Sequence, residues 1–400
     1  MLDGKTLAKA LSTTPGPWMK EALDVVMAWQ LRHPEKTDAE AAIEEVRNSK
    51  LHGELTADIV SHLLRLTIRP LFAKNQHPAV TAQGRRVTTH NLPRKIEYQR
   101  SDEEINPWKG RDAYALDLLH WTVTNLDESL VEANWPYLIP PILSITDDHE
   151  TKHKAKGCDL ITELLQVTTP ALLARTGLGR VLEEAIMPCL SYLPSFTPVH
   201  ESTTLLSKAF PALIALSKVT YPSVTPPGSR LTAQEQKDRK IAFLDSVVRK
   251  GVLSAYNHCP EHVEIVNVLL SNLVLLNNEL GIESVKHLKY VLPMLTDILT
   301  NPFGTAHAPS LLSAAKAMQS VILNGWPRMP THRGEVLKAL TLCWLQIHDT
   351  TDEALAQVRD ELRTTVAMLR IAVKADCDID TDFAALIEAD DRLEPLFRAS

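Results

Sequence analysis

Apolar residues recur at three- and four-residue spacing near the start of the chain, and this spacing predicts helices. The first row consists of Trp18, Ala22, Val25, Val26 and Trp29. Pro17 suits the first turn of this helix and Pro34 ends it. A short second helix is predicted over residues 38–47 and a third over 54–73, where leucine and isoleucine again recur at helical spacing.

From residue 111 to the end, the same helical spacing continues in blocks separated by short turns marked by Pro, Gly or Asp. The predicted helices cover residues 111–126, 128–146, 152–167, 170–191, 201–219, 234–256, 261–280, 284–300, 308–324, 331–348, 352–374 and 383–397. Pro188 and Pro211 lie late in or inside a block and predict kinks. Strand-type alternation is nowhere sustained, so the sequence predicts an all-α fold.

Paired helices that repeat about every 35–45 residues with little identity between repeats are typical of an α-solenoid. We therefore expect a HEAT/armadillo-like α-solenoid of antiparallel helix pairs, with an irregular helical bundle as the alternative. Three parts are predicted: a short helical segment over 1–50, a helix plus a basic linker over 51–110, and the repeat domain over 111–400. The proline- and charge-rich stretch 219–240 is predicted to be a mobile loop within the repeat domain.

Composition supports a helical, soluble protein and argues against binding to polyanions. The chain has only 14 glycines and 5% aromatic residues, and its formal net charge is −7. An acidic chain does not attract nucleic acid or an anionic membrane through its overall field. The five widely spaced cysteines are predicted to be reduced core thiols. No apolar run is expected to reach the roughly 18 residues needed to cross a bilayer, and we expect a cytoplasmic and nuclear protein.

The densest group of metal-ligand residue types is His258, Cys259, Glu261 and His262. Pro260 separates the two histidines, so they are not expected to share a preformed helical face. No second cluster supplies the further ligands that a structural metal site needs. The sequence therefore predicts no metal site.

Two other motifs are explained better by local structure than by chemistry. Gly177 and Gly179 could suggest a phosphate-binding loop, but they follow a helix instead of a strand, and we expect them to end one helix and begin the next. Asp378 and Asp380 have the spacing of a two-metal carboxylate pair. They lie in an acidic hinge, and a solvated cap of the last helix is the expected role.

No arrangement of serine, histidine and acid, and no cysteine signature, predicts a nucleophilic active site. Four tryptophans are expected first as core or groove residues: Trp121, Trp135, Trp326 and Trp344. Because Trp135 and Trp326 each precede a proline at a predicted helix junction, partner anchoring is the alternative for these two.

A series of motifs in order along residues 107–350 resembles the Tel-two-interacting protein two family, a HEAT-like subunit of the TTT co-chaperone complex. The motifs are Pro-Trp-Lys at 107–109, Tyr-Ala-Leu-Asp-Leu-Leu at 114–119, Asn-Trp-Pro at 134–136, Ile-Pro-Pro at 139–141, Lys-Gly-Cys-Asp-Leu at 156–160, Arg-Thr-Gly-Leu at 175–178, Tyr-Leu-Pro at 192–194, Thr-Pro at 197–198, Val-Lys-His-Leu at 285–288, Asn-Pro-Phe-Gly at 301–304, Asn-Gly-Trp-Pro-Arg at 324–328 and His-Arg-Gly-Glu at 332–335. The end of the chain is compatible with the same family.

This resemblance implies a non-catalytic scaffold or adaptor with no cofactor. The implied partners are two other helical-repeat subunits of the TTT complex, the heat-shock chaperone machinery and the phosphatidylinositol-kinase-related kinases (PIKKs) that the complex matures and stabilises. Checkpoint, telomere and nutrient signalling would depend on it. Carried over as a binding surface, the motif residues give these candidate partner contacts: Trp108, Trp135, Arg175, Trp326, Arg328, His332 and Arg333.

Residues 2–48 resemble something different, the C-terminal tail of a fungal CCA-adding tRNA nucleotidyltransferase. The stretches that carry this are Leu-Asp-Gly-Lys at 2–5, Pro-Gly-Pro-Trp-Met at 15–19, Ala-Trp-Gln-Leu at 28–31 and His-Pro at 33–34. The catalytic head of that family, with its paired aspartates, is not found in the sequence, so nucleotide polymerisation is not expected. The alternative function is a fragment or auxiliary of tRNA 3′-end maturation. A natural fusion and a merged gene model would both produce this junction.

Overall fold

The computed structural model describes residues 18–33, 39–73, 77–87, 106–222 and 232–398. These residues form an all-α fold, and their only β pairing is an isolated antiparallel bridge between Val80 and Arg86. The predicted fold class is therefore confirmed. The chain divides into two compact units, Met1–Gln76 with Pro93–Pro141 and His77–Leu92 with Ile142–Ser400. Each unit is described by itself.

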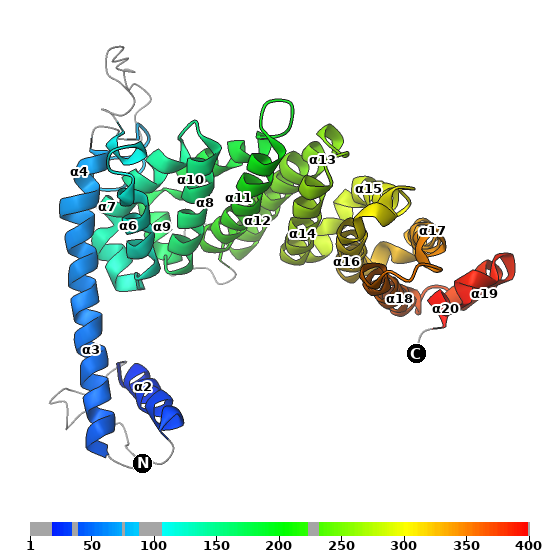
Figure 1. Cartoon of the computed structure of the whole chain (residues 1–400), viewed down its shortest axis with the longest axis horizontal. Helices are drawn as coiled ribbons and strands as arrows, with labels where there is room; N and C mark the ends of the chain where they lie inside the picture. Colours follow the sequence, from blue (N-terminus) through cyan, green and yellow to red (C-terminus); the bar gives the residue numbers. More distant parts are fainter. Residues whose placement is uncertain (1–17, 34–38, 74–76, 88–105, 223–231, 399–400) are drawn as a thin grey trace. The chain divides into compact units, whose positions relative to one another are not determined.

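The first unit begins with two helices that share a small apolar core. Its elements are α2 (Trp18–Arg32), α3 (Ala39–His62), the π-helical turns η1 (Leu63–Ile68), α4 (Arg69–Phe72), the 3-10 turn η2 (Pro107–Lys109), α6 (Tyr114–Thr124) and most of α7 (Glu128–Thr146) (Figure 1). The core between α2 and α3 consists of Ala22, Val26, Trp29, Ala42 and Val46. These α2 positions fall on the apolar row that the sequence pattern identifies.

Helix α3 differs from the sequence-based prediction of separate helices over 38–47 and 54–73. It is one helix that runs through the intervening residues and continues into η1 and α4 without a turn. A single glycine in a helix interior costs only about 1 kcal/mol relative to alanine, so Gly53 does not end the helix. The sequence-based division after residue 50 therefore falls inside α3.

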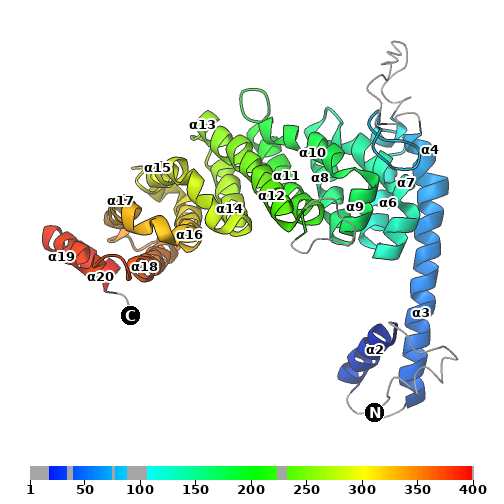
Figure 2. The same ribbon diagram turned by 180° about the vertical axis from the view of Figure 1, so that it is seen from behind.

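The second unit contains the repeated helices. In chain order they are the end of α7, α8 (Thr151–Gln166), α9 (Pro170–Thr176), α10 (Gly179–Ile186), η3 (Met187–Ser191), α11 (Val199–Thr220), α12 (Ala233–Val247), η4 (Val248–Leu253), α13 (Ser254–His258), α14 (Val263–Leu280), η5 (Gly281–His287), α15 (Leu288–Leu299), η6 (Gly304–His307), α16 (Ala308–Gly325), η7 (Trp326–Arg328), α17 (Met329–Ile347), α18 (Glu353–Val373), α19 (Ile379–Ala389), η8 (Asp391–Leu393) and α20 (Glu394–Phe397). The succession from α8 to α18 can be followed from either side (Figures 1 and 2).

Helices α8, α11, α14, α16 and α18 form one row, in which each packs on the next. Polar contacts link neighbouring members: Lys208 Nζ donates to Asp159 at 2.7 Å between α11 and α8, and Asn277 Nδ2 donates to Ser320 at 3.0 Å between α14 and α16. Helices α15 and α17 pack on each other and cover α16 and α18 from one side. This two-layer repetition is the arrangement of a helical-repeat solenoid.

Glu279 on α14 joins three helices by accepting hydrogen bonds from Lys218 of α11 and Lys240 of α12, each at 2.8 Å. Burial opposes ionisation of this carboxyl group, but the two ammonium groups outweigh it and lower its pKa. Because the folded pKa lies below the unfolded one, the stabilisation is present above about pH 4.5 and is lost as the pH falls below it.

We expect Glu279→Gln to lower the free energy of unfolding by about 1 kcal/mol at neutral pH, a modest value because Lys218 is largely exposed. The difference from the wild type should shrink as the pH falls below 4.5. Urea unfolding at several pH values measures this. A difference that stays constant through that range would contradict the role given to the carboxylate.

Several helix ends carry recognisable capping residues. Thr232 accepts a hydrogen bond from the Glu235 amide while the Glu235 side chain accepts one from the Thr232 amide, a capping box that fixes the start of α12. The predicted loop over 219–240 is therefore shorter, because α11 continues to Thr220 and α12 begins at Ala233. Residues 223–231, within that loop, lie outside the described residues.

Residues 77–87 of the predicted basic linker belong to the second unit and contact its helices. The His77 imidazole lies 2.6 Å from the Asp147 carboxylate, and the Arg86 amide donates to the Thr176 carbonyl at 3.0 Å. Residues 77–87 are thus held at both ends by the unit they belong to. The rest of the predicted linker, residues 74–76 and 88–105, lies outside the described residues.

The expectation that no apolar run reaches bilayer-crossing length is too strong. Within the described residues, the stretch Val263–Leu299 contains an 18-residue segment with a mean hydropathy of 1.4. By length and composition alone, such a segment could cross a membrane. The stretch comprises α14, η5 and α15, and half of the 18-residue segment is buried inside the protein. A core helix of a helical array has the same composition, and packing against α11 and α16 explains it here.

Candidate functional site

Four of the seven candidate partner contacts lie close together around η7 and the first turns of α17. Trp326 and Arg328 are exposed, with 55% of the Trp326 surface accessible. His332 and Arg333 are half-buried. The Arg333 guanidinium donates to Asp382 at 2.8 Å and to the Pro330 carbonyl at 2.8 Å, and the Asp382 carboxylate raises the pKa of Arg333. Arg333 therefore joins α17 to α19, whereas Trp326 and Arg328 remain available at the surface.

Trp108 and Trp135 belong to the first unit and lie in its interior. Trp108 has no accessible surface and stacks on Phe72 with ring centroids 5.4 Å apart, while Trp135 is 2% exposed. Both side chains are therefore core residues. For Trp135 this is the first of the two expected roles, a core residue and not an anchor for a partner. Of the other tryptophans, Trp344 is buried and Trp121 is exposed.

Arg175 is exposed near the end of α9, away in sequence from the η7 group. The helix ends immediately afterwards, because Gly177 adopts a left-handed conformation (φ 69°) and its amide donates to the Leu173 carbonyl. Gly179 is the first residue of α10. The expectation that these glycines end one helix and begin the next is confirmed.

Asp148, Glu150 and His153 are the strongest candidates for a metal site within the second unit. One ligand atom of each lies within 4.8 Å of the others, and Asp148 and His153 are buried. Protein groups already occupy these atoms: Asp148 Oδ1 accepts from the Glu150 amide at 2.9 Å and lies 3.1 Å from His153 Nδ1, and Lys152 Nζ lies 2.7 Å from Glu150. Together these contacts organise the turn into α8.

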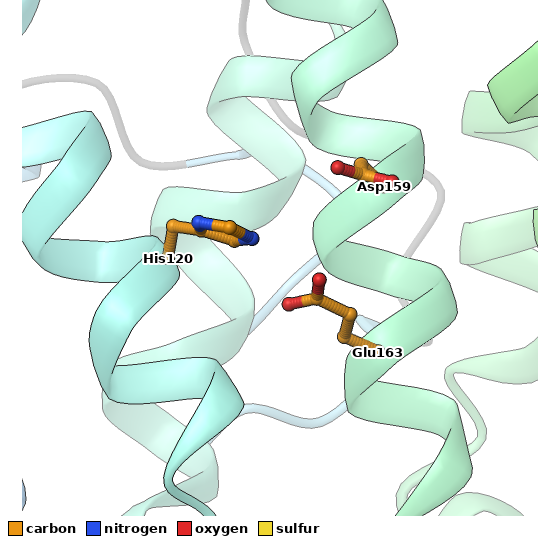
Figure 3. A group of neighbouring side chains, drawn as sticks. All are labelled: His120, Asp159 and Glu163. Carbon is orange, nitrogen blue, oxygen red and sulfur yellow. The ribbon is translucent and has the colours of Figure 1, made fainter.

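Asp159 and Glu163 stand one helical turn apart on the same side of α8, as Figure 3 shows. Asp159 is engaged by Lys208 of α11. The same figure shows His120, which belongs to α6 of the first unit. Within the second unit, the Asp159 carboxylate therefore has a structural role as an ion-pair partner between repeats.

The cluster around His258 and the Asp378–Asp380 motif, both considered above as metal ligands, make contacts that stabilise the fold. His258 Nε2 lies 3.1 Å from the Pro194 carbonyl, and the Cys259 thiol donates to the Ala255 carbonyl at 3.2 Å. Asp378 caps α19 by accepting from the Asp380 amide, and Asp380 is paired with Arg370 at 2.6 Å. The capping role expected for this motif is confirmed for Asp378, whereas the Asp380 side chain pairs with Arg370.

The cysteines are free thiols, four of them buried and Cys377 half-buried. Burial raises the pKa of Cys343 to about 12 and that of Cys259 to about 11. A thiol that stays protonated at neutral pH is a poor nucleophile. The core position predicted for the thiols is confirmed for the buried four.

One of the larger surface hollows lies beside the turn into α8 and the loop before α11. It has a volume of about 580 Å³ and is lined by charges of both signs, including Lys152 and Glu201. Two of the lining residues are joined by a hydrogen bond, which the Thr151 hydroxyl donates to the Glu201 carboxylate. Phe196, on its rim, is 97% exposed. These residues form no sequence motif, because they come from separate helices and turns that are brought together only by the fold.

Comparison with known families gives one long match. The model of the Tti2 family matches residues 26–306, which reach from α2 in the first unit to η6 in the second. No solved structure matches the chain.

Comparison with curated proteins gives short matches to enzymes. The chain is 62% identical over 47 residues to the nucleotidyltransferase lcsQ of Purpureocillium lilacinum, a match covering 12% of this chain and 8% of that protein. It is 45% identical over 40 residues to the mitochondrial CCA tRNA nucleotidyltransferase of Candida glabrata, covering 10% of this chain and 8% of that one. The chain thus spans less than a tenth of the length of these relatives.

Proposed function

The chain belongs to the Tti2 family, and from this premise we propose that it is a non-catalytic scaffold subunit of a TTT-type co-chaperone complex. The complex assists the maturation and stability of the phosphatidylinositol-kinase-related kinases. The observation that carries the proposal is the family match over residues 26–306, which extends across both units. A scaffold role also suits a helical array, because stacked repeats offer long surfaces to other proteins.

The chemistry of the described residues supports a scaffold in preference to an enzyme. The carboxylates and histidines that could form a site instead cap helices and join repeats, as Asp148, Asp159 and Asp378 do. Two buried thiols have raised pKa values. Networks of structural ion pairs place charged groups close together without an active site.

The proposed partners are two other helical-repeat subunits, the heat-shock chaperone machinery and the kinase clients. The proposed location is the cytoplasm and the nucleus, where these kinases act. Trp326 and Arg328 are the exposed members of the candidate contact set in the η7 group, and Trp and Arg are enriched at binding hot spots.

Affinity purification of the tagged full chain from its native cells tests the proposal. We expect two large helical-repeat proteins to co-purify in amounts comparable to the chain, and depletion of the chain to lower the abundance of the kinases. Recovery of the chain alone, with kinase abundance unchanged on depletion, would remove the basis for the scaffold function.

A second candidate function has its own observation, the short matches to two nucleotidyltransferases. Under this alternative, the chain contributes to tRNA 3′-end maturation through residues 1–50. Filter binding to tRNA at increasing salt distinguishes the two. Salt-dependent binding that disappears on deletion of residues 1–50 would favour the tRNA function, and equal weak binding by both forms would count against it.

A further inference from the structure

A second surface hollow in the helical-repeat unit lies between the turn before α14 and the loop before α16. Its volume is about 390 Å³. The apolar part of its lining includes Val263, Val266, Ile298, Phe303 and Leu311. We call this surface, together with the neighbouring Glu261 and Asp297, the Phe303 surface. A hollow of this size accommodates one large aliphatic or aromatic side chain of another protein.

Phe303 lies on the rim of this hollow with 82% of its surface exposed. Its loop is nevertheless well fixed. The Phe303 amide donates to Asn301 Oδ1 at 2.9 Å, the Gly304 amide donates to the Asn301 carbonyl at 2.9 Å, and Gln346 donates to the Thr300 carbonyl at 3.1 Å. An aromatic ring held at the surface by an ordered turn loses little conformational freedom on binding, which favours a role as a binding anchor.

Gly304 adds a packing reason for the position of this turn. A Cβ at this residue would lie 2.9 Å from the Leu311 side chain, so the loop approaches the first turns of α16 closely. The close approach fixes the backbone beside the hollow, and the turn presents Phe303 outward. The exposed ring therefore belongs to a defined backbone geometry.

Among lysine, arginine, aspartate and glutamate, only the two acidic types line the hollow, where His307 is the one further titratable side chain besides Tyr256. None of the residues that line the hollow is lysine or arginine, whereas Glu261 and Asp297 both line it. The sequence extends this pattern, because residues 251–285, 290–315 and 339–358 contain neither lysine nor arginine. These three stretches include the turns before α14, α16 and α18, none of which contains lysine or arginine in its own sequence.

The two carboxylates are placed differently. Asp297 accepts a hydrogen bond from the Tyr256 hydroxyl at 2.7 Å, and burial together with this carboxylate raises the pKa of Tyr256. The Glu261 side chain is 66% exposed and lies 3.5 Å from His262 Nε2. Glu261 can thus meet an incoming cation, and Asp297 gives a fixed negative charge at the wall of the hollow.

We propose that the Phe303 surface binds a segment of a partner protein in which a large apolar side chain stands next to a lysine or arginine. The apolar side chain enters the hollow and packs on Phe303, and the cation meets Glu261 and Asp297. Charge complementarity selects this occupant over an acidic or purely apolar one, because an acidic segment would be repelled by the carboxylates of Glu261 and Asp297. The proposal rests on the scaffold function above, since the segment would belong to a subunit or client of the same assembly.

Selection from a phage-displayed library of random peptides on the immobilised full chain tests the proposal. The library is first passed over the immobilised Phe303→Ala chain, which removes peptides that bind elsewhere on the protein. We expect the enriched peptides to share an apolar residue beside lysine or arginine, and their affinity measured by fluorescence anisotropy to fall about tenfold or more on Phe303→Ala. Glu261→Gln should weaken the same peptides less and reduce their dependence on salt.

Phe196→Ala is the matched control, because Phe196 is also an exposed phenylalanine of a loop but lies beside charges of both signs. We expect this variant to bind the selected peptides like the wild type. Thermal unfolding of the three variants checks that each is folded, which the exposure of Phe303, Phe196 and Glu261 predicts. Enrichment of acidic peptides, no enrichment over the Phe303→Ala chain, or equal loss on Phe196→Ala would overturn the proposal.

Two further outcomes separate this proposal from the scaffold function. If the tagged wild type and the Phe303→Ala chain recover the same partners with equal stability to salt, the scaffold function stands and the Phe303 surface is not its contact. If the wild type recovers no partner, the scaffold function fails, and the peptide selection still decides the chemistry of the surface.

Sedimentation that shows a Phe303-dependent dimer would assign the surface to a second copy of the chain and overturn the proposal.

Discussion

Replacement of Gly157 by alanine is expected to destabilise the helical-repeat unit by about 3 kcal/mol, the upper part of the usual range for overpacking. A Cβ at this position would lie 2.3 Å from Thr146 Oγ1, 2.7 Å from its Cα and 2.8 Å from its amide nitrogen. Two of these three atoms belong to the backbone, so a side-chain rotation cannot relieve the clash. The end of α7 and helix α8 would have to move apart.

That movement would also break a buried polar contact. Lys154, which is 6% exposed, donates its Nζ hydrogen to the Thr146 carbonyl at 3.1 Å and lies over the Tyr192 ring. Separating the helices would leave a buried ammonium group without this acceptor, which adds to the loss. The close approach at Gly157 and the contact of Lys154 therefore depend on each other.

Gly334→Ala is the matched control for the change at Gly157. Gly334 is also helical, in α17, but a Cβ there would have no neighbour within 4 Å. Alanine should stabilise that helix by up to about 1 kcal/mol, because glycine has the poorer helix propensity. Urea unfolding followed by circular dichroism measures both variants. Equal effects of the two substitutions would show that helix packing at Thr146 is not the cause.

The second large effect is expected at Trp344, whose replacement by alanine should cost about 3–5 kcal/mol. The side chain is 2% exposed, and its indole Nε1 donates to the Arg392 carbonyl at 2.8 Å. The Arg363 guanidinium lies 5.0 Å from the ring centroid. Truncation would therefore leave a cavity beside α18 and an unpaired carbonyl in the chain that leads to α20.

Two comparison variants separate these contributions. Trp344→Phe keeps most of the buried ring and loses the hydrogen bond, so it should cost less than the alanine variant. Trp326→Ala removes a tryptophan that is 55% exposed and should change stability by no more than about 0.5 kcal/mol. Urea unfolding again gives the values, and a cost at Trp326 equal to that at Trp344 would contradict the burial assigned to them.

The fold class follows from the sequence because apolar spacing reports which face of each helix is buried. The row from Ala22 to Trp29 and the run of leucines in α14 lie in the core where that spacing places them. Helix boundaries were harder to predict. Gly53 is a weak breaker on its own, and the packing of α12 and its capping box decide where the loop after α11 ends.

The motifs do not tell which candidate contacts are exposed, because a motif residue can be kept for packing as well as for binding. Trp108 and Trp326 both stand in motifs with proline, yet one has no accessible surface and the other is exposed. Sequence spacing does not carry that difference, since it depends on which neighbouring repeat covers the ring. One feature of the Phe303 surface is visible in the sequence. Residues 251–285 and 290–315 contain neither lysine nor arginine, an absence that forms no motif.

The most direct test of the scaffold function is the mass of the native assembly. Native mass spectrometry of the complex purified through the tagged full chain should give a species whose mass is that of this chain plus two larger helical-repeat proteins. Peptide sequencing of the same sample identifies the two partners. A species with the mass of this chain alone, obtained at low salt from cells that contain the kinases, would contradict the scaffold function.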